Sequence, residues 1–323
     1  MDFPAIFNEK YALFYEFGII IHAKSLGFEQ VLIKRPCFHS RLKLLIEVPR
    51  GVKSTVRKYW HVIGIGIQNN LTYRFNYLTR TLFSFIPLFA MLSLWRTVYA
   101  SKGQGSSLSG FTQPEMIFYY LMVAVVDVLT AVNEDDWQIA ADIREGNINW
   151  FLLKPMDYLW YRLSLFFAGR VAFTTMASIP LALFIFCFRK NFMLPPDTLT
   201  FIAFLLSLVL AALLQFFISY TMAILAFWLL EISTLIFILF AFEYLASGHL
   251  FPLSMLPQAL QHVLFFTPFP YQLYFPVGIY MGKISGTQLQ AGLMVQFGWV
   301  MIAFVLARFA WARGIKKYGA FGG

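Results

Sequence analysis

The chain has 323 residues, of which 59% are hydrophobic, 19% aromatic and only 13% charged. A soluble domain of this length carries about a quarter charged residues, so this chain has too little polar surface to stay in water as a globule. Its net charge of +9 needs no nucleic-acid partner, because membrane proteins concentrate lysine and arginine in loops that stay in the cytoplasm. The composition therefore predicts an all-α, polytopic membrane protein that lies in the lipid bilayer.

The first 58 residues differ in composition from the remainder of the chain. Lysine and arginine crowd residues 34–58, and no apolar segment before them is long enough to span a bilayer. We therefore expect residues 1–58 to form a basic extension in the cytoplasm. The next segment, residues 59–77, mixes aromatic and aliphatic side chains with asparagine and glutamine, which is typical of a helix lying in the headgroup plane.

Six apolar blocks of spanning length follow, and long uninterrupted apolar blocks are typical of bilayer spans. The fourth and fifth blocks run together almost without a polar break, and we interpret them as two helices joined by a tight turn. The expected spans are residues 78–99, 114–132, 163–188, 199–220, 224–246 and 289–311.

The distribution of cations among the loops predicts the orientation. The segment before the first span is strongly basic, and the tail after the last span carries Arg313, Lys316 and Lys317. The loops assigned to the outside hold few cations. Because cytoplasmic loops carry the excess of lysine and arginine, both termini are predicted to be cytoplasmic, which agrees with an even number of spans. Residues 319–323 form a short tail.

Residues 133–162 make a long connection on the cytoplasmic side, between the second and third expected spans. Charged and apolar residues are interleaved here, so the segment suits neither the bilayer nor bulk water. We expect it to fit the surface of a partner. Gly146 is predicted to stop a helix, and Pro155 to begin one or to make a corner.

Residues 247–286 make the outer connection between the fifth and sixth expected spans. This connection is very apolar, yet it contains five prolines. Its apolar runs are about ten residues long, the length of re-entrant or interfacial helices. Irregular backbone survives at membrane depth only where protein or a water-filled cavity satisfies it, so we expect this connection to dip into the outer leaflet.

Each of these two connections carries a motif. The inner loop holds Arg144-Glu145-Gly146-x-Ile148-x-x-x-Leu152-Leu153-Lys154-Pro155, and the outer connection holds Ser247-Gly248-x-x-Phe251-Pro252-Leu253-x-x-Leu256-Pro257 and then Thr267-Pro268-Phe269. With an amino-terminal interfacial helix, six spans and both ends inside, their order resembles the type-2 ABC exporter permeases, the bacterial ABC-2 family of transporter permease subunits. The resemblance covers residues 58–318.

The resemblance implies the permease subunit of an ABC exporter in the bacterial plasma membrane, with the path between two identical or related permease chains. It implies a separate ATPase subunit that uses ATP and magnesium, while this chain itself binds no cofactor. The inner loop would be the element that couples to the ATPase. The residues expected there are Asp142, Arg144, Glu145, Gly146, Ile148, Leu152, Leu153, Lys154 and Pro155.

Two further points depend on this resemblance. Within the inner loop, Ile148, Leu152 and Leu153 are expected to fill a groove of the ATPase, with charged residues at its rim. Residues 1–50 have no counterpart in the family, which leaves open a genuine extension or a start codon assigned too far upstream.

Ionisable residues within spans are costly and are therefore candidates for the translocation path. We assign Asp127, Glu231 and Glu243 to this group, and leave open that Asp127 pairs with Arg170 to join two helices. His249 is interpreted as a satisfied interfacial histidine. The residues expected to shape the outer re-entrant connection are Gly248, Pro252, Pro257 and Pro268.

The sequence contains no arrangement of catalytic residues and no spacing that predicts a metal site. Residues 278–283 have one spacer too few for a phosphate-binding loop, so the energy must come from another chain. A proton-coupled secondary transporter, with Asp127 and Glu231 as carriers, is the alternative interpretation. A membrane-embedded transferase built on residues 134–136 is a third.

Overall fold

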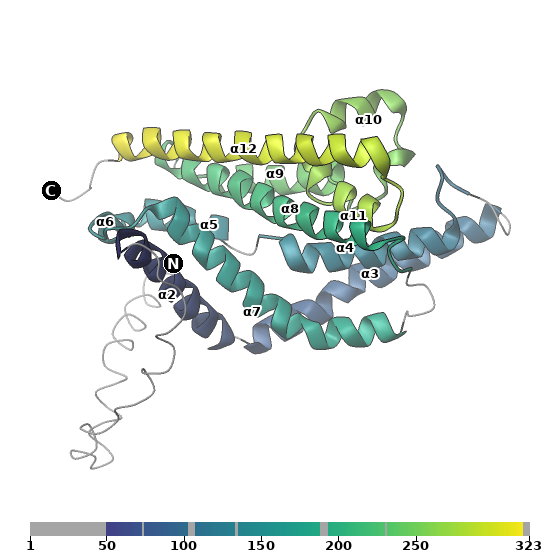
Figure 1. Ribbon diagram of the computed structural model, residues 1–323, viewed down its shortest axis with the longest axis horizontal. Helices are drawn as coiled ribbons and strands as arrows, with labels where there is room; N and C mark the ends of the chain where they lie inside the picture. The colour runs from purple at the N-terminus through teal and green to yellow at the C-terminus, as the bar shows by residue number, and fades with distance from the viewer. Residues whose placement is uncertain are drawn as a thin grey trace, which may run out of the picture. The chain divides into compact units, whose positions relative to one another are not determined.

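The computed structural model describes residues 50–72, 74–102, 107–132, 135–187, 193–229 and 231–318. The expectations for residues 1–49 and 319–323 lie outside these ranges. The chain divides into two compact units at Lys53, and the account below concerns the unit that begins at Ser54. Every regular element in the described ranges is a helix, which confirms the predicted all-α class (Figure 1).

The helices are named with the labels of Figure 1. The long helices are α2 (Arg50–Thr72), α3 (Arg74–Lys102), α4 (Gln113–Thr130), α7 (Tyr158–Cys187), α8 (Thr198–Ile224) and α12 (Gly286–Lys317). The shorter ones are α5 (Asp135–Arg144), α6 (Ile148–Leu152), α9 (Ser233–Ala246), α10 (Gln258–Phe265) and α11 (Tyr274–Tyr280). Single 3₁₀ turns are η2 (Leu225–Phe227), η3 (Leu253–Met255) and η4 (Phe269–Tyr271).

Five helical segments in the described ranges are long and apolar enough to cross a membrane. Since an apolar helix of about 20 residues matches the hydrocarbon thickness of a bilayer, the chain is a multi-pass integral membrane protein. The five segments are Thr81–Lys102, Gln113–Thr130, Tyr158–Leu183, Thr198–Phe227 and Gly286–Lys317.

The predicted fifth span, residues 224–246, is not one continuous helix. α8 ends at Ile224 and is followed by the 3₁₀ turn η2, and the next α-helix begins only at Ser233. The resulting α9 has 14 residues, which makes it about 21 Å long at 1.5 Å per residue, shorter than the hydrocarbon core of about 30 Å. The boundary is therefore corrected, and the count of six spans is not established by helix length alone.

Helix starts are fixed by side chains that satisfy free backbone amides. At the start of α4, the Thr112 amide donates to Oε2 of Glu115 over 2.8 Å, as in a capping box. At the start of α8, the Thr200 amide donates to Oδ1 of Asp197 over 2.9 Å. At the other end of a helix, Gly146 adopts φ +78° just after α5, which confirms the predicted stop.

α8 lies at the centre of the helical unit and packs against α12, α11, α5 and α4. Its buried face carries large apolar residues such as Phe204, Leu214 and Phe217. Other residues of the same helix, for example Ile202 and Leu206, are exposed. Lipid tails favourably surround exposed aliphatic side chains, so this exposure agrees with a membrane-spanning helix.

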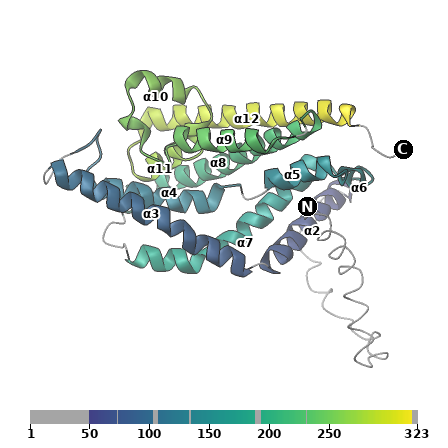
Figure 2. The ribbon, with the colours of Figure 1, turned by 180° about the vertical axis from the view of Figure 1, so that it is seen from behind.

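The two ends of the bundle carry different elements. We call the end that carries α5, α6 and the carboxyl-terminal end of α12 the inner end, and the end that carries α10 the outer end (Figures 1 and 2). α2 reaches the inner end, where the Asp157 amide donates to the Tyr59 hydroxyl over 3.2 Å. α2 also approaches α7 closely at Gly66, where a Cβ atom would lie 2.8 Å from that of Ala168.

Candidate functional site: the inner loop and a pocket beside Asp127

The inner loop is fastened to α7 by a buried ion pair. Arg162, on the first turns of α7, contacts the carboxylate of Asp142 on α5 and is only 5% exposed. The Tyr158 hydroxyl donates to the same carboxylate over 3.0 Å, and Nε of Arg162 donates to that hydroxyl over 3.0 Å. Asp142 therefore holds α5 on α7, and its expected role in coupling to a partner stays a prediction.

The beginning of α7 is also fastened to α12. The ring of Tyr158 stacks on that of Trp311, with centroids 4.7 Å apart and an angle of 13° between planes. One residue earlier, Asp157 forms an ion pair with Arg308. The inner loop is thus joined to α7 and α12, two of the helices that are long and apolar enough to cross a membrane.

The short helix α6 presents a sharply divided surface. Ile148 and Phe151 are buried, whereas Trp150, Leu152 and Leu153 are 73%, 47% and 79% exposed. Ile148 is thus a core residue, and the expectation that it fills a partner's groove is wrong for this structure. The charged residues expected at the rim, Arg144, Glu145 and Lys154, are exposed, and so is Pro155.

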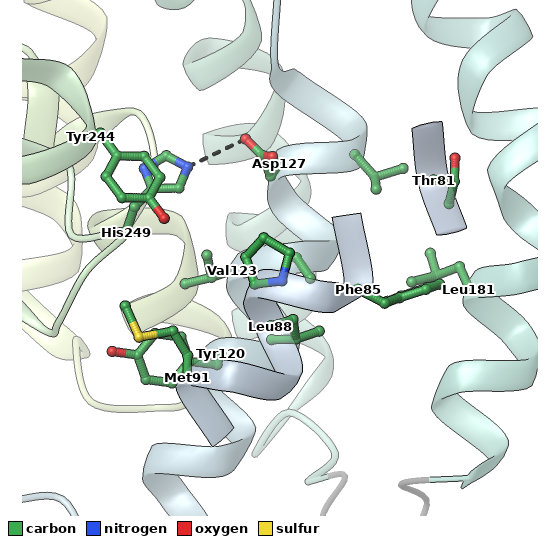
Figure 3. A pocket seen from close by; sticks show the side chains of 13 residues that line it. Thr81, Phe85, Leu88, Met91, Tyr120, Val123, Asp127, Leu181, Tyr244 and His249 are labelled. Atoms are coloured by element: carbon green, nitrogen blue, oxygen red, sulfur yellow. Dashed lines mark hydrogen bonds and ion pairs between the residues drawn. The ribbon is translucent and has the colours of Figure 1, made fainter. Parts of the chain in front are cut away.

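A pocket opens beside Asp127, between α3, α4, α7 and the turn after α9 (Figure 3). Oδ1 of Asp127 lies 3.4 Å from Nε2 of His249, and Nδ1 of His249 lies 2.7 Å from the Ser247 hydroxyl. The imidazole also stacks on the ring of Tyr244. His249 is therefore satisfied, as predicted, and it carries the contact to the acid on α4. The described residues lining the pocket are Thr81, Phe85, Pro87, Leu88, Met91, Tyr120, Val123, Ala124, Asp127, Val128, Leu181, Tyr244 and His249.

The other two path candidates lie elsewhere. Glu243, on α9, is buried and accepts a hydrogen bond of 3.0 Å from Nε2 of Gln215 on α8. Glu231 is exposed in the connection before α9, where its carboxylate accepts the Ser233 amide over 2.7 Å. Hydrogen bonding to Ser233 lowers the pKa of Glu231, so this carboxyl is ionised near neutral pH. The structure does not bring the three acids together in one cavity.

Arg170, the partner left open for Asp127, lies on α7. Its guanidinium donates to the Val128 carbonyl over 3.4 Å and lies over the rings of Phe166 and Phe173. Arg170 therefore joins α7 to the last turn of α4 through a backbone carbonyl, that of the residue after Asp127.

The outer connection turns back into the bundle at Gly248. This residue has φ +96°, and a Cβ atom there would lie 2.7 Å from the Tyr119 hydroxyl, so only glycine fits without strain. Tyr119 donates to the Gly248 carbonyl over 2.6 Å, and Tyr120 donates to that of Leu250. These tyrosines lie near the middle of α4, so residues 247–250 lie beside the middle of a spanning helix rather than beyond its end.

The prolines that were expected to shape this connection lie at the starts of its short helical elements. Pro252, which is buried, precedes η3, Pro257 precedes α10, and Pro268 precedes η4. Proline suits these places because its fixed φ begins a helical turn and its missing N–H would be unpaired there. α11, which follows, is largely buried and packs on α8 and α4.

The comparisons with known proteins place the chain in a family. Residues 85–322 match the family described as ABC-2 family transporter protein. The chain belongs to this family. No curated protein and no solved structure matches it significantly. The ABC-2 family and the spanning helices together identify the chain as a membrane permease component of a transporter.

Reasoning from the sequence of this ABC-2 permease missed several residues. Arg162 lies at the edge of the inner loop, at the start of an apolar block. A cation in such a position needs an acidic partner, and this was the only feature of the sequence that could have identified it. Trp150 lies within the motif but was not chosen, although tryptophan is enriched among the residues that anchor protein interfaces. In the described part of the chain, no three acidic, histidine or cysteine side chains gather closely enough to hold a metal.

Proposed function

We propose that this chain is the permease subunit of an ABC exporter, forms the path with a second permease chain, and is driven by a separate ATPase that docks on α6. The single observation that carries the proposal is the exposure of Trp150, Leu152 and Leu153 on a helix whose other face is fixed in the core. Large apolar side chains exposed together on a protein surface mark an interaction site.

The docking surface has the composition of an interface. Its centre is the α6 surface, which we define as Trp150, Leu152 and Leu153, and its rim carries Arg144, Glu145 and Lys154. Aromatic and aliphatic anchors supply most of the binding energy of such surfaces, while rim charges set orientation and association rate. An ATPase subunit is the occupant that the family supports, since ABC-2 permeases normally work with one.

The contacts behind α6 give a route for the force. α5 packs on α8 and η2, and its Ala140 lies in a cluster with Ile232 and Ile236 at the start of α9. The ion pair of Asp142 and the stacked rings of Tyr158 and Trp311 continue the route to α7 and α12. A push on the α6 surface is therefore delivered to four spanning or near-spanning helices at once.

The test is association of the ATPase with a tagged full-length chain in the native host. Trp150→Ala with Leu153→Ala should remove most of the co-purifying ATPase and uncouple hydrolysis from transport, because each anchor contributes about 2 kcal/mol. Lys154→Ala should give a milder, salt-sensitive loss. The captured protein must carry a phosphate-binding loop, or the association does not count.

Leu194→Ala is the matched control, because Leu194 is 86% exposed and lies between α7 and α8, away from the inner loop. It should leave association unchanged. Undiminished capture and coupling in the double variant would refute docking on α6. The proton-coupled alternative is less well supported, because Glu231, one of its two carriers, is exposed and has a lowered pKa.

A further inference from the structure

The pocket beside Asp127 combines an acid with an apolar wall inside the membrane-spanning part of the chain. Asp127 lies fourteen residues after Gln113 and three before Thr130, so it is in the last turn of α4, about 21 Å from the start of this membrane-spanning helix. Its side chain is nevertheless 49% exposed. A carboxylate at this depth is costly unless a cation or hydrogen-bond donors offset the loss of water.

His249 lies against this carboxylate and is held at both of its ring nitrogens. Its Nδ1 lies 2.7 Å from the Ser247 hydroxyl, and its Nε2 lies 3.4 Å from Oδ1 of Asp127. Half of the Asp127 side chain still faces the pocket, so a ligand can reach it beside His249 (Figure 3).

The remainder of the pocket suits an apolar body. Phe85, Leu88 and Met91 line one wall along α3, and Val123 lines the facing wall on α4. The lining on α3 runs from Thr81 to Met91, about 15 Å along the helix axis. Among the described residues of the lining there is no lysine or arginine, and Arg170, which donates to the Val128 carbonyl, is not part of the lining.

We propose that this pocket binds cationic amphiphiles, with a protonated amine on the Asp127 carboxylate and an alkyl or aromatic body along α3. An ammonium group regains hydrogen bonds and charge attraction in a region of low dielectric, where both are stronger than in water. An anionic amphiphile of the same length meets the carboxylate and is repelled. The inference deepens the proposed function, because in a permease such a ligand is the cargo.

Binding is measured on the full-length chain alone, in phosphatidylcholine nanodiscs, with empty nanodiscs as the blank. The probe is radiolabelled dodecylamine, and dodecanol and dodecanoate are competitors with the same chain. The wild type should bind the amine at least tenfold more tightly than either competitor. Asp127→Asn should abolish that preference, whereas Asp127→Glu should keep it.

Two further variants keep the result decisive if Asp127→Asn does not fold. Ala124→Leu enlarges a lining side chain and should weaken binding of amine and alcohol alike. Glu231→Gln neutralises an exposed acid outside the lining and should change nothing. Equal affinity for amine, alcohol and acid in the wild type, or an equal effect of Glu231→Gln, would overturn the proposal.

A second experiment determines whether the bound amine belongs to a membrane lipid or to a free amphiphile. Nanodiscs that contain phosphatidylethanolamine present the same primary ammonium group on a lipid. Competition by that lipid would identify the occupant as a lipid amine, and lack of competition would identify it as a free amphiphile. Because no ATPase takes part in these measurements, a failure of α6 docking leaves the result interpretable, and a failure of amine binding leaves the docking proposal intact.

Discussion

Arg162 has a side chain that is only 5% exposed, although arginine is among the residues that proteins bury least. Three groups compensate for the lost water: the Asp142 carboxylate, the Tyr158 hydroxyl and the Gln138 side chain, whose Oε1 lies 3.5 Å away. The guanidinium also lies over the Tyr158 ring. A buried charge held by several partners fixes one geometry for the contact between α5 and α7.

Removing the acid of this pair should destabilise the inner loop. Asp142→Asn leaves the buried guanidinium without its anion. Breaking a fully buried pair costs about 3 kcal/mol of stability, and the cost here should be smaller because the Asp142 side chain is 30% exposed. We expect a lower thermal midpoint of the purified chain and weaker ATPase association. Glu145→Gln is the control, since this exposed acid lies one turn away and should shift the midpoint little. Equal midpoints for the two variants would contradict the structural role of Asp142.

The role of Asp142 also shows where prediction from sequence ended. The stop at Gly146 and the exposure of Leu152 and Leu153 followed from local pattern. The direction in which Asp142 points depends on its contact with Arg162, twenty residues later in the chain. A local sequence pattern gives no information about contacts between residues so far apart. Ile148 and Leu152 are both apolar members of one motif, yet only the fold decides which of them is buried.

At the scale of helices, the sequence predicted elements better than it predicted their ends. Five of the six predicted spans overlap helices that are long and apolar enough to cross a membrane, because their apolar blocks are bounded by polar or turn residues. The junction of α8 and α9 lacks such punctuation, so α8 was ended too early and α9 was begun nine residues too soon at residue 224. Packing of η2 against α5 and α12 fixes this break, and those contacts are tertiary.

The contact of α12 with η2 depends on one small residue. A Cβ atom at Gly314 would lie 2.2 Å from Cδ2 of Phe227, closer than real Cβ atoms approach another carbon. Gly314→Ala should therefore push Phe227 out of its place between Trp311 and Tyr318, at a cost of about 1–3 kcal/mol. The thermal midpoint should fall, and Phe227→Leu in the same chain should restore part of it.

The same substitution elsewhere in α12 supplies the control. Gly298 has no atom within 4 Å of its Cβ position, so Gly298→Ala should leave the midpoint unchanged or raise it slightly, as alanine favours helix. An equal loss in both variants would mean that glycine matters for helix flexibility and that the packing on Phe227 is irrelevant.

For the whole molecule, the number of membrane crossings depends on α9. At 14 residues it is too short to cross a bilayer by itself. It ends at Ala246, where residues 247–250 turn beside the middle of α4 and the chain continues to the outer end through α10 and α11. A crossing at this position would be completed by the irregular chain beside α4, where the hydroxyls of Tyr119 and Tyr120 satisfy the carbonyls of Gly248 and Leu250.

Labelling of single cysteines in intact cells decides between six crossings and five. In a chain with Cys37 and Cys187 replaced by serine, we expect Leu194→Cys and Gln258→Cys to react with an impermeant maleimide. Lys154→Cys and Lys317→Cys should react only after the membrane is opened. If α9 did not cross, Gln258→Cys would be protected and Lys317→Cys would be labelled from outside. The basic residues Arg313, Lys316 and Lys317 favour the first outcome, because such residues stay in the cytoplasm.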